Sequence, residues 1–172
     1  PSGDIDPQPT LSPDEKRVAV ALREGAKTDS DIWLFDLARG VSSRFTFDPG
    51  NDRAPLWSPD GRQIAYYTLQ GDDWEILSLS VDDGESRNLT RNPGTDTYPH
   101  WSPDGRSIVF HSRRDGDWEI YRMGSDGRNP RRLADLPERR CRRLRLLVPA
   151  QPGPALRRGG REIDHSPAAL GG

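Results

Sequence analysis

Short runs of apolar residues, separated by glycine, proline and aspartate, dominate residues 1–135. In the middle of this region the segments between turn formers are Ala54 to Trp57, Gln63 to Thr68, Trp74 to Leu79 and Ser86 to Thr90. Gly71-Asp72 and Asp82-Asp83-Gly84, which lie between runs, have the composition of hairpin turns. The pattern predicts four short strands, because no helical period survives between the turn formers.

The second of these runs is apolar on both faces of the strand that it predicts. Ile64 and Tyr66 would point to one side of a strand, and Ala65 and Tyr67 would point to the other. A sheet with one face in water would instead alternate apolar and polar residues. This pattern fits a blade sandwiched between neighbouring blades, since both faces of its sheet are then covered.

The same pattern recurs along the chain with a period of 44 residues. The string WSPDGR occurs at residues 57–62 and again at residues 101–106. The repeats that this offset defines span residues 5–48, 49–92 and 93–135. A period of about 40–45 residues is typical of a four-stranded propeller blade. The sequence therefore predicts an all-β fold, a partial β-propeller of about three four-stranded antiparallel blades.

The repeated string is interpreted as the turn between the first and second strands of a blade. Its residues are Trp57, Ser58, Pro59, Asp60 and Gly61 in the second repeat, and Trp101, Ser102, Pro103, Asp104 and Gly105 in the third. Proline presets the first corner, and glycine takes the positive φ that closes the turn. We expect the serine hydroxyl to bond a turn amide and the tryptophan to pack beside the next blade. A catalytic role would require a base, and no copy has a histidine at a matching position.

An earlier copy of the turn, Leu11-Ser12-Pro13-Asp14, lies 46 residues before its successor. Leu11 replaces the tryptophan in this copy, and Glu15 replaces the glycine. Because a glutamate is unfavourable at positive φ, we expect this turn to be looser or of another type.

The composition agrees with a fold of many short strands and tight turns. Hydrophobic residues make up only 32% of the 172 residues, but five tryptophans argue for a packed core rather than disorder. No apolar run is long enough to span a membrane. The chain begins at Pro1 without a methionine, so we expect it to be a piece of a longer protein.

The repeat is lost after residue 135, where the balance of charge also changes sign. Residues 1–135 hold 17 basic and 24 acidic side chains, whereas residues 136–172 hold 8 basic and 3 acidic ones. Arg145 stands where a fourth repeat requires its tryptophan. Three interpretations stay open for this tail: a basic segment for nucleic acid or an anionic surface, a disordered tail, or a reading-frame shift in a longer propeller gene. We expect no nucleic-acid partner, because the tail lacks interleaved aromatic residues.

Sequence motifs for catalysis, metal binding and nucleotide binding are absent. There is no Gly-x-Ser-x-Gly elbow, no phosphate-cradling glycine loop and no kinase catalytic loop. A single cysteine, Cys141, and three histidines without regular spacing form no metal-ligand pattern. The sequence therefore predicts a non-catalytic chain with no cofactor and no metal.

Two equivalent aspartates are the candidates for a binding site. Asp52 and Asp96 each lie three residues before the proline of a first strand. The first strand of a blade is innermost, so these carboxylates are expected at the mouth of the central channel. In one interpretation they form a polar ring that receives a peptide, a cation or a partner loop, together with Arg53, Tyr98 and His100. In the other, each carboxylate caps a neighbouring turn and tightens the loop between blades.

The third repeat resembles the TolB-like, WD-repeat-like propeller repeat of bacteria. The matching residues are Pro99, Trp101 to Arg106, Ile108, Glu119-Ile120-Tyr121, Asp126-Gly127 and Arg132-Leu133. The resemblance implies a propeller that binds partner proteins, as in periplasmic Tol systems, and an extracytoplasmic location. It also implies two enzyme-linked roles. One is the gate of a prolyl-oligopeptidase-like serine peptidase, and the other is a domain appended to a bacterial serine/threonine kinase, which residues 31–40 resemble most.

The sequence as a whole predicts a non-catalytic β-propeller module for protein or peptide binding or sensing. The alternative is an accessory propeller of an enzyme, either a kinase sensor or a peptidase gate. Three blades cannot close a ring, since propellers have about four to eight. We therefore expect a larger propeller, or the assembly of chains through open blade edges.

Overall fold

The computed structural model describes residues 8–25 and 27–133, and strands are the only regular structure in this part of the chain. The first sheet contains β1 (Thr10–Leu11), β2 (Arg17–Arg23), β3 (Ser30–Asp36) and β4 (Val41–Arg44). The second contains β5 (Arg53–Trp57), β6 (Gln63–Gln70), β7 (Asp73–Ser80) and β8 (Ser86–Asn88). The third contains β9 (Asp96–Trp101), β10 (Ser107–Ser112), β11 (Glu119–Gly124) and β12 (Arg131–Arg132).

Strands that are adjacent in the sequence pair antiparallel within each sheet. The predicted all-β fold of three four-stranded antiparallel blades is therefore confirmed. The interpretations offered for residues 136–172 fall outside the described residues, so the division at residue 135 stays a prediction.

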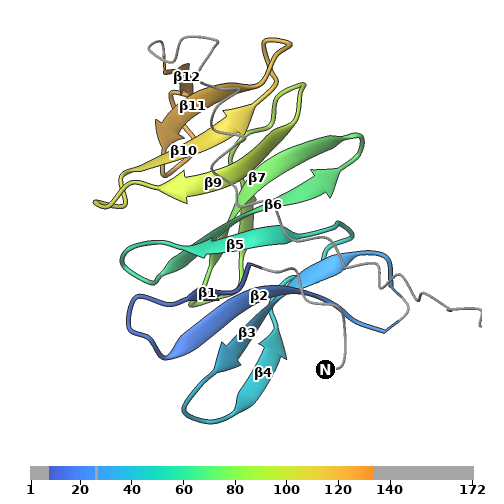
Figure 1. The fold of residues 1–172 in the computed structure, drawn as a ribbon, viewed down its shortest axis with the longest axis vertical. Coiled ribbons are helices and arrows are strands. Elements are labelled where there is room, and N and C mark those ends of the chain that lie inside the picture. The colour runs from blue at the N-terminus through green and yellow to red at the C-terminus, as the bar shows by residue number, and fades with distance from the viewer. Residues whose placement is uncertain (1–7, 26, 134–172) are drawn as a thin grey trace, which may run out of the picture. The chain divides into compact units, whose positions relative to one another are not determined.

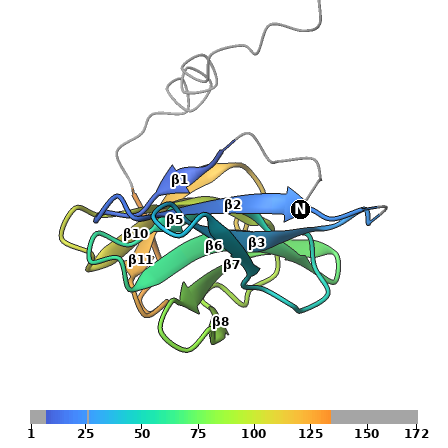
Figure 2. The ribbon, with the colours of Figure 1, turned by 90° about the horizontal axis from the view of Figure 1, so that it is seen from below.

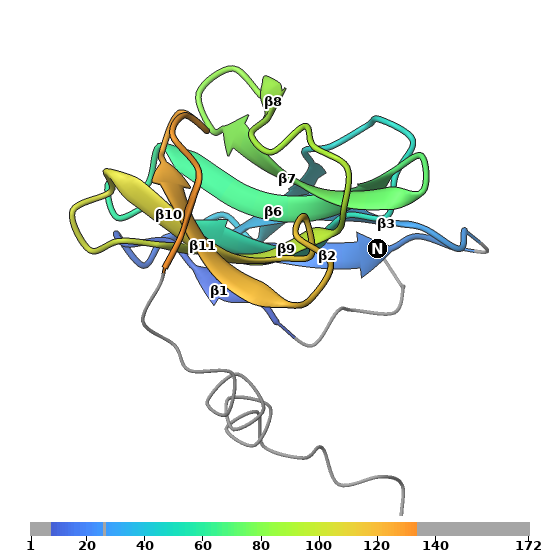
Figure 3. The ribbon, with the colours of Figure 1, turned by 90° about the horizontal axis from the view of Figure 1, so that it is seen from above.

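The three sheets lie one beside another in chain order (Figure 1). Their first strands are neighbours, since β5 contacts both β1 and β9. In the views from below and above, β1 lies toward one side of the sheets and β8 toward the opposite side (Figures 2 and 3). This order, with each first strand on the inner side, is the arrangement of propeller blades.

Two apolar clusters fill the spaces between the sheets. The cluster between the first and second sheets contains Ala19, Ala21, Ile32, Leu34, Trp57, Ile64, Tyr66, Leu77, Leu79 and Val81. The cluster between the second and third contains Tyr67, Ile76, Leu89, Ile108, Phe110, Tyr121 and Met123. Ile64 and Tyr66 therefore face one neighbour and Tyr67 the other. The expectation that the second sheet is covered on both faces is confirmed, and it explains why its apolar residues do not alternate with polar ones.

The turn after each first strand is held by its own serine and aspartate. In the second blade, the Ser58 hydroxyl donates to Asp60 Oδ1 at 2.6 Å and accepts from the Gln63 amide at 2.9 Å. The Arg62 amide donates to the same carboxylate oxygen at 3.1 Å. Gly61 has a φ of 70°. These bonds close the turn locally and support its structural interpretation.

The first copy of the turn corrects one expectation from the sequence. Glu15 has a φ of 58°, so it adopts the left-handed conformation that glycine has in the other copies. The Ser12 hydroxyl donates to Asp14 Oδ1 at 2.6 Å, and the Arg17 amide donates to the Ser12 hydroxyl at 2.9 Å. The prediction of a looser or different turn is wrong, because the serine and aspartate impose the same geometry on a glutamate.

The tryptophans that end the first strands of the second and third blades pack on the preceding blade, and the prediction that they pack beside the next one is wrong. The Trp57 indole N–H donates to the Thr10 carbonyl of the first blade at 3.1 Å, and the Trp101 indole N–H donates to the Leu56 carbonyl of the second blade at 3.2 Å. The carbonyls of an innermost strand are free on its open edge, so an indole from the following blade satisfies one of them. Each tryptophan thereby fastens its own blade to the one before it.

Candidate binding surface

Five aromatic side chains form a continuous row across the second and third blades. We call this row, made of Tyr67, Trp74, Tyr98, His111 and Trp118, the aromatic row. Its successive ring centroids are 5.3 Å apart for Trp74 and Tyr67, 5.3 Å for Tyr67 and Tyr98, 5.7 Å for Tyr98 and His111, and 6.5 Å for His111 and Trp118. These separations are those of tilted or edge-on aromatic contacts.

The repeat itself places the row at one end of the blades. Tyr67 and His111 are equivalent positions near the end of a second strand, and Trp74 and Trp118 are equivalent positions just after the hairpin that follows. These hairpins lie at the opposite end of each blade from the Ser-Pro-Asp turns, because consecutive strands run antiparallel. Tyr98, from β9, fills the gap between the two halves of the row.

A β-bulge turns Tyr98 outward. The pairing of β9 with β10 shifts register beside Tyr98, and the pairing of β5 with β6 shifts at the equivalent residue, Ala54. Both residues have positive φ, 53° at Tyr98 and 47° at Ala54. A positive φ is strained in a non-glycine residue, so the surrounding structure must hold the backbone in this conformation. The result is a tyrosine with 45% of its surface exposed.

Two arginines lie over the ends of the row. The Arg53 guanidinium carbon is 5.3 Å from the Trp74 ring centroid, and that of Arg113 is 5.7 Å from the Trp118 centroid. Trp118 is 42% exposed. Burial lowers the pKa of His111, with a further contribution from the charge of His100, so His111 presents a neutral ring at pH 7. Tyr67 is only 7% exposed and belongs to the core, so the accessible rings of the row are mainly Tyr98, His111 and Trp118. An arginine lies over the tryptophan at each end of the row.

The two aspartates predicted to ring the channel mouth are buried instead. Asp52 is 4% exposed and Asp96 is 0% exposed. Arg114 forms an ion pair with the Asp96 carboxylate at 3.1 Å. Asp52 joins two blades through its backbone, because its amide donates to the Ser30 carbonyl at 2.8 Å and its carbonyl accepts from the Ser30 hydroxyl at 2.7 Å. The role of the two carboxylates, as a polar ring or as caps that tighten the loop between blades, stays a prediction.

The five predicted binding residues are not brought together. Tyr98 belongs to the aromatic row and Arg53 lies over Trp74 at its end, whereas Asp52 and Asp96 are buried. His100 lies elsewhere, in a hollow that Leu11, Trp57 and Pro103 also line. A binding role for any of these residues stays a prediction.

Sequence reasoning missed the aromatic row, although a signal for it was present. Trp74 and Trp118 are 44 residues apart and so occupy equivalent positions of the repeat, and Tyr67 is expected on a covered sheet face. The informative sign was that aromatic residues recur at matching positions on both sides of two hairpins. The sequence names Tyr98 as a candidate at the channel mouth, but its outward direction depends on a bulge that alternation along the strand does not predict.

Among the described residues, no group of three or more histidine, cysteine, aspartate and glutamate side chains is arranged to hold a metal ion. The expectation of no metal and no cofactor stays a prediction. The described residues also contain no helix that could cross a membrane.

The four-stranded sheets with a shared inner edge define a β-propeller, and the family model described as "TolB beta propeller domain" matches residues 5–140. The chain therefore belongs to the TolB beta-propeller family.

Solved structures and curated relatives agree with this family. The chain is similar to a protein assigned as TolB from Agrobacterium tumefaciens, with a TM-score of 0.69 and 30% identity, covering 77% of this chain and 47% of that one. TolB from Acinetobacter baumannii gives a TM-score of 0.66 and 29% identity, covering 76% and 32%. The uncharacterized peptidase YuxL of Bacillus subtilis is 35% identical over 82 residues, which are 45% of this chain and 12% of the relative. Dipeptidyl-peptidase 5 of Porphyromonas endodontalis is 32% identical over 72 residues, 38% and 10% respectively.

This chain thus matches about a tenth of the length of its curated relatives and less than half of either TolB structure.

Proposed function

We propose that this chain is a non-catalytic module that binds a protein or peptide partner through the aromatic row. The observation that carries the proposal is the exposure of Tyr98 and Trp118, 45% and 42%, within one continuous set of ring contacts. Tyrosine, tryptophan and arginine are the residues that contribute most binding energy at protein interfaces. The row and the two arginines over its end tryptophans combine all three on one end of the blades.

The rigidity of the row also favours a binding role. Tyr98 is fixed by its bulge and by rings on both sides, and the two end tryptophans carry guanidinium groups. A partner that covers these rings would therefore lose little side-chain entropy of the row on binding. An extended peptide with apolar or proline side chains fits such a surface, because aromatic-lined surfaces hold extended segments by stacking.

The test is a selection of 12-residue displayed peptides on the full chain, followed by affinity measurements on variants. Replacing Tyr98 and Trp118 by alanine is expected to weaken the selected peptides at least roughly tenfold, in line with the loss of two aromatic anchors. The matched control replaces Leu37 and Val41 by alanine. These two are 55% and 56% exposed but belong to the first blade, away from the row. The proposal fails if the control pair weakens binding as much as the row pair does.

A second candidate function is supported by the curated relatives. Both are peptidases, and each match spans only 72 to 82 residues of a much longer protein. In this candidate the chain is an accessory propeller of a serine peptidase, and the aromatic row holds the peptide that approaches the enzyme. The genomic sequence on either side of the coding region distinguishes the two candidates, because a hydrolase domain downstream in the same frame supports the peptidase. Hydrolysis of a dipeptidyl anilide by the isolated chain would contradict both.

A further inference from the structure

Two slots between blades lie at the end of the propeller that carries the Ser-Pro-Asp turns. The first slot lies between the turn of the first blade and Trp57, and the second lies between the turn of the second blade and Trp101. Arg17 and Gln63 occupy equivalent positions in the two slots, because each begins the second strand of its blade, β2 or β6. This end is opposite to the aromatic row.

The first slot is filled by the protein itself. The guanidinium carbon of Arg17 lies 5.1 Å from the ring centroid of Trp57, in a stacking contact between neighbouring blades. Val81 belongs to the same apolar cluster as Trp57, and the indole is only 6% exposed. A cation over an indole is favourable, more so when water is excluded.

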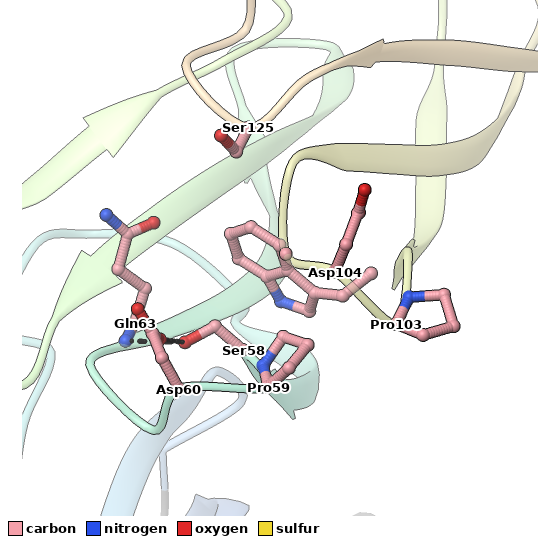
Figure 4. Close-up of a pocket in the computed structure, with 9 residues that line it drawn as sticks. Ser58, Pro59, Asp60, Gln63, Pro103, Asp104 and Ser125 are labelled. Carbon is pink, nitrogen blue, oxygen red and sulfur yellow. Dashed lines mark hydrogen bonds between the residues drawn. The ribbon is translucent and has the colours of Figure 1, made fainter.

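The second slot is open because two residues differ from their equivalents. Gln63 replaces the arginine, and its Oε1 accepts a hydrogen bond from the Ser78 hydroxyl at 3.0 Å. Ser125 takes the place that Val81 has in the first slot. The two residues are equivalent, because the Val81 amide donates to the Arg62 carbonyl and the Ser125 amide donates to the Arg106 carbonyl. Trp101 remains partly exposed. A pocket of about 350 Å³ results, lined by Ser58, Pro59, Asp60, Gln63, Trp101, Pro103, Asp104, Gly105 and Ser125 (Figure 4).

The pocket is acidic. Two aspartates, Asp60 and Asp104, and no basic side chain are among its lining residues. Each carboxylate takes its hydrogen bonds from serine and from the turn amide on Oδ1. The serine hydroxyl, followed by the backbone amide, lowers the pKa of each aspartate, so both are charged at neutral pH. The volume lies within the range of about 300–1,000 Å³ that small-ligand sites occupy.

We propose that this pocket binds the guanidinium group of an arginine side chain from a partner protein. The first slot provides the precedent, because the chain's own Arg17 stacks on the equivalent indole there. The carboxylates of Asp60 and Asp104 supply the charge that a planar cation requires, and bidentate pairing with carboxylate is the preferred geometry of arginine. The site lies on the other end of the blades from the aromatic row, so it does not depend on the function proposed above.

The test is a titration of the full chain with N-acetyl-arginine methylamide, followed by NMR of the indole N–H groups. A saturable shift of the Trp101 indole is expected, while Trp57, already covered by Arg17, stays unchanged. The citrulline analogue has the same shape without the charge, and it is expected to produce no saturable shift. The proposal is wrong if the arginine compound leaves Trp101 unchanged, or if citrulline shifts it equally.

Gln63→Arg tests the precedent directly. This variant places an internal guanidinium over Trp101, so it is expected to abolish the response to the arginine compound. The matched control is Gln70→Arg, the same substitution at the other end of the same strand, which is expected to leave the response intact. Arg17→Gln is expected to open the first slot and add a Trp57 shift. Binding that survives Gln63→Arg in a protein with a native-like spectrum would overturn the proposal.

Discussion

The Arg114 guanidinium holds the buried carboxylate of Asp96, with Nη2 3.1 Å from Oδ2 and 3.3 Å from Oδ1. The equivalent pair in the second blade is incomplete. Gln70 stands at the position of Arg114, and its Oε1 accepts a hydrogen bond from Asn88 at 2.9 Å. No ion pair among the described residues involves Asp52. Asp52 and Asp96 occupy the same position of the repeat and are both buried. Within the described residues, only Asp96 has an ion-pair partner.

Asp52→Asn is expected to stabilise the protein at neutral pH. Burial raises the pKa of Asp52 to about 6. The folded state therefore binds this proton more tightly than the unfolded state, whose pKa is near 3.8. Wild-type stability falls as pH rises from about 4 through about 6, and asparagine removes this loss. The free energy of unfolding at pH 7.5 should rise by about 1 to 3 kcal/mol.

Urea denaturation at pH 4 and at pH 7.5 measures both parts of this expectation. The variant should gain most over the wild type at pH 7.5 and little at pH 4. A variant that is less stable than the wild type at both values would show that the carboxylate is needed in its charged form.

Asp96→Asn is expected to have the opposite effect. The same substitution at this position leaves Arg114, which is only 15% exposed, without its charged partner. Breaking a buried pair from one side typically costs about 3 kcal/mol or more. We expect a loss of about 2 to 4 kcal/mol by urea denaturation at pH 7.5, and partial recovery when Arg114→Gln is added. Equal effects of the two aspartate substitutions would contradict the assignment of the ion pair to Asp96 alone.

The contrast between these aspartates shows what the sequence could and could not predict. The period of the repeat and the chemistry of its turn are local, so the strands of the second blade could be placed to within about two residues. The depth of Asp52 and Asp96 depends on how two blades pack, and the sequence pattern does not contain that information. The prediction for the direction of Trp57 was wrong for the same reason. A strand has two faces, and only the packing of the neighbouring sheet determines which face is covered.

Trp57→Phe is expected to destabilise the protein more than Trp101→Phe. Both substitutions remove an indole that bonds the preceding blade, worth about 1 kcal/mol. Trp57 is 6% exposed and also carries the Arg17 guanidinium, whereas Trp101 borders an open pocket. We expect losses of about 2 to 3 kcal/mol for Trp57→Phe and about 1 to 2 for Trp101→Phe, measured by denaturation followed by circular dichroism. The reverse order would contradict the closed and open states assigned to the two slots.

Glu15→Gly is expected to stabilise the first turn. Glu15 is exposed and has a φ of 58°, a left-handed conformation that costs a side-chain residue about 1–2 kcal/mol. Glycine removes this strain but adds about 0.5–1 kcal/mol of backbone entropy to lose on folding. The net gain should be about 0.5–1 kcal/mol in the free energy of unfolding, measured by urea denaturation.

The control is Gly61→Ala at the equivalent position. A Cβ there would lie 3.6 Å from Pro13 Cδ, an ordinary contact, so its expected loss of about 1 kcal/mol comes from the backbone alone. If Glu15→Gly instead destabilises the protein while Gly61→Ala does so as expected, the Glu15 side chain must stabilise the turn by more than the strain that its backbone carries.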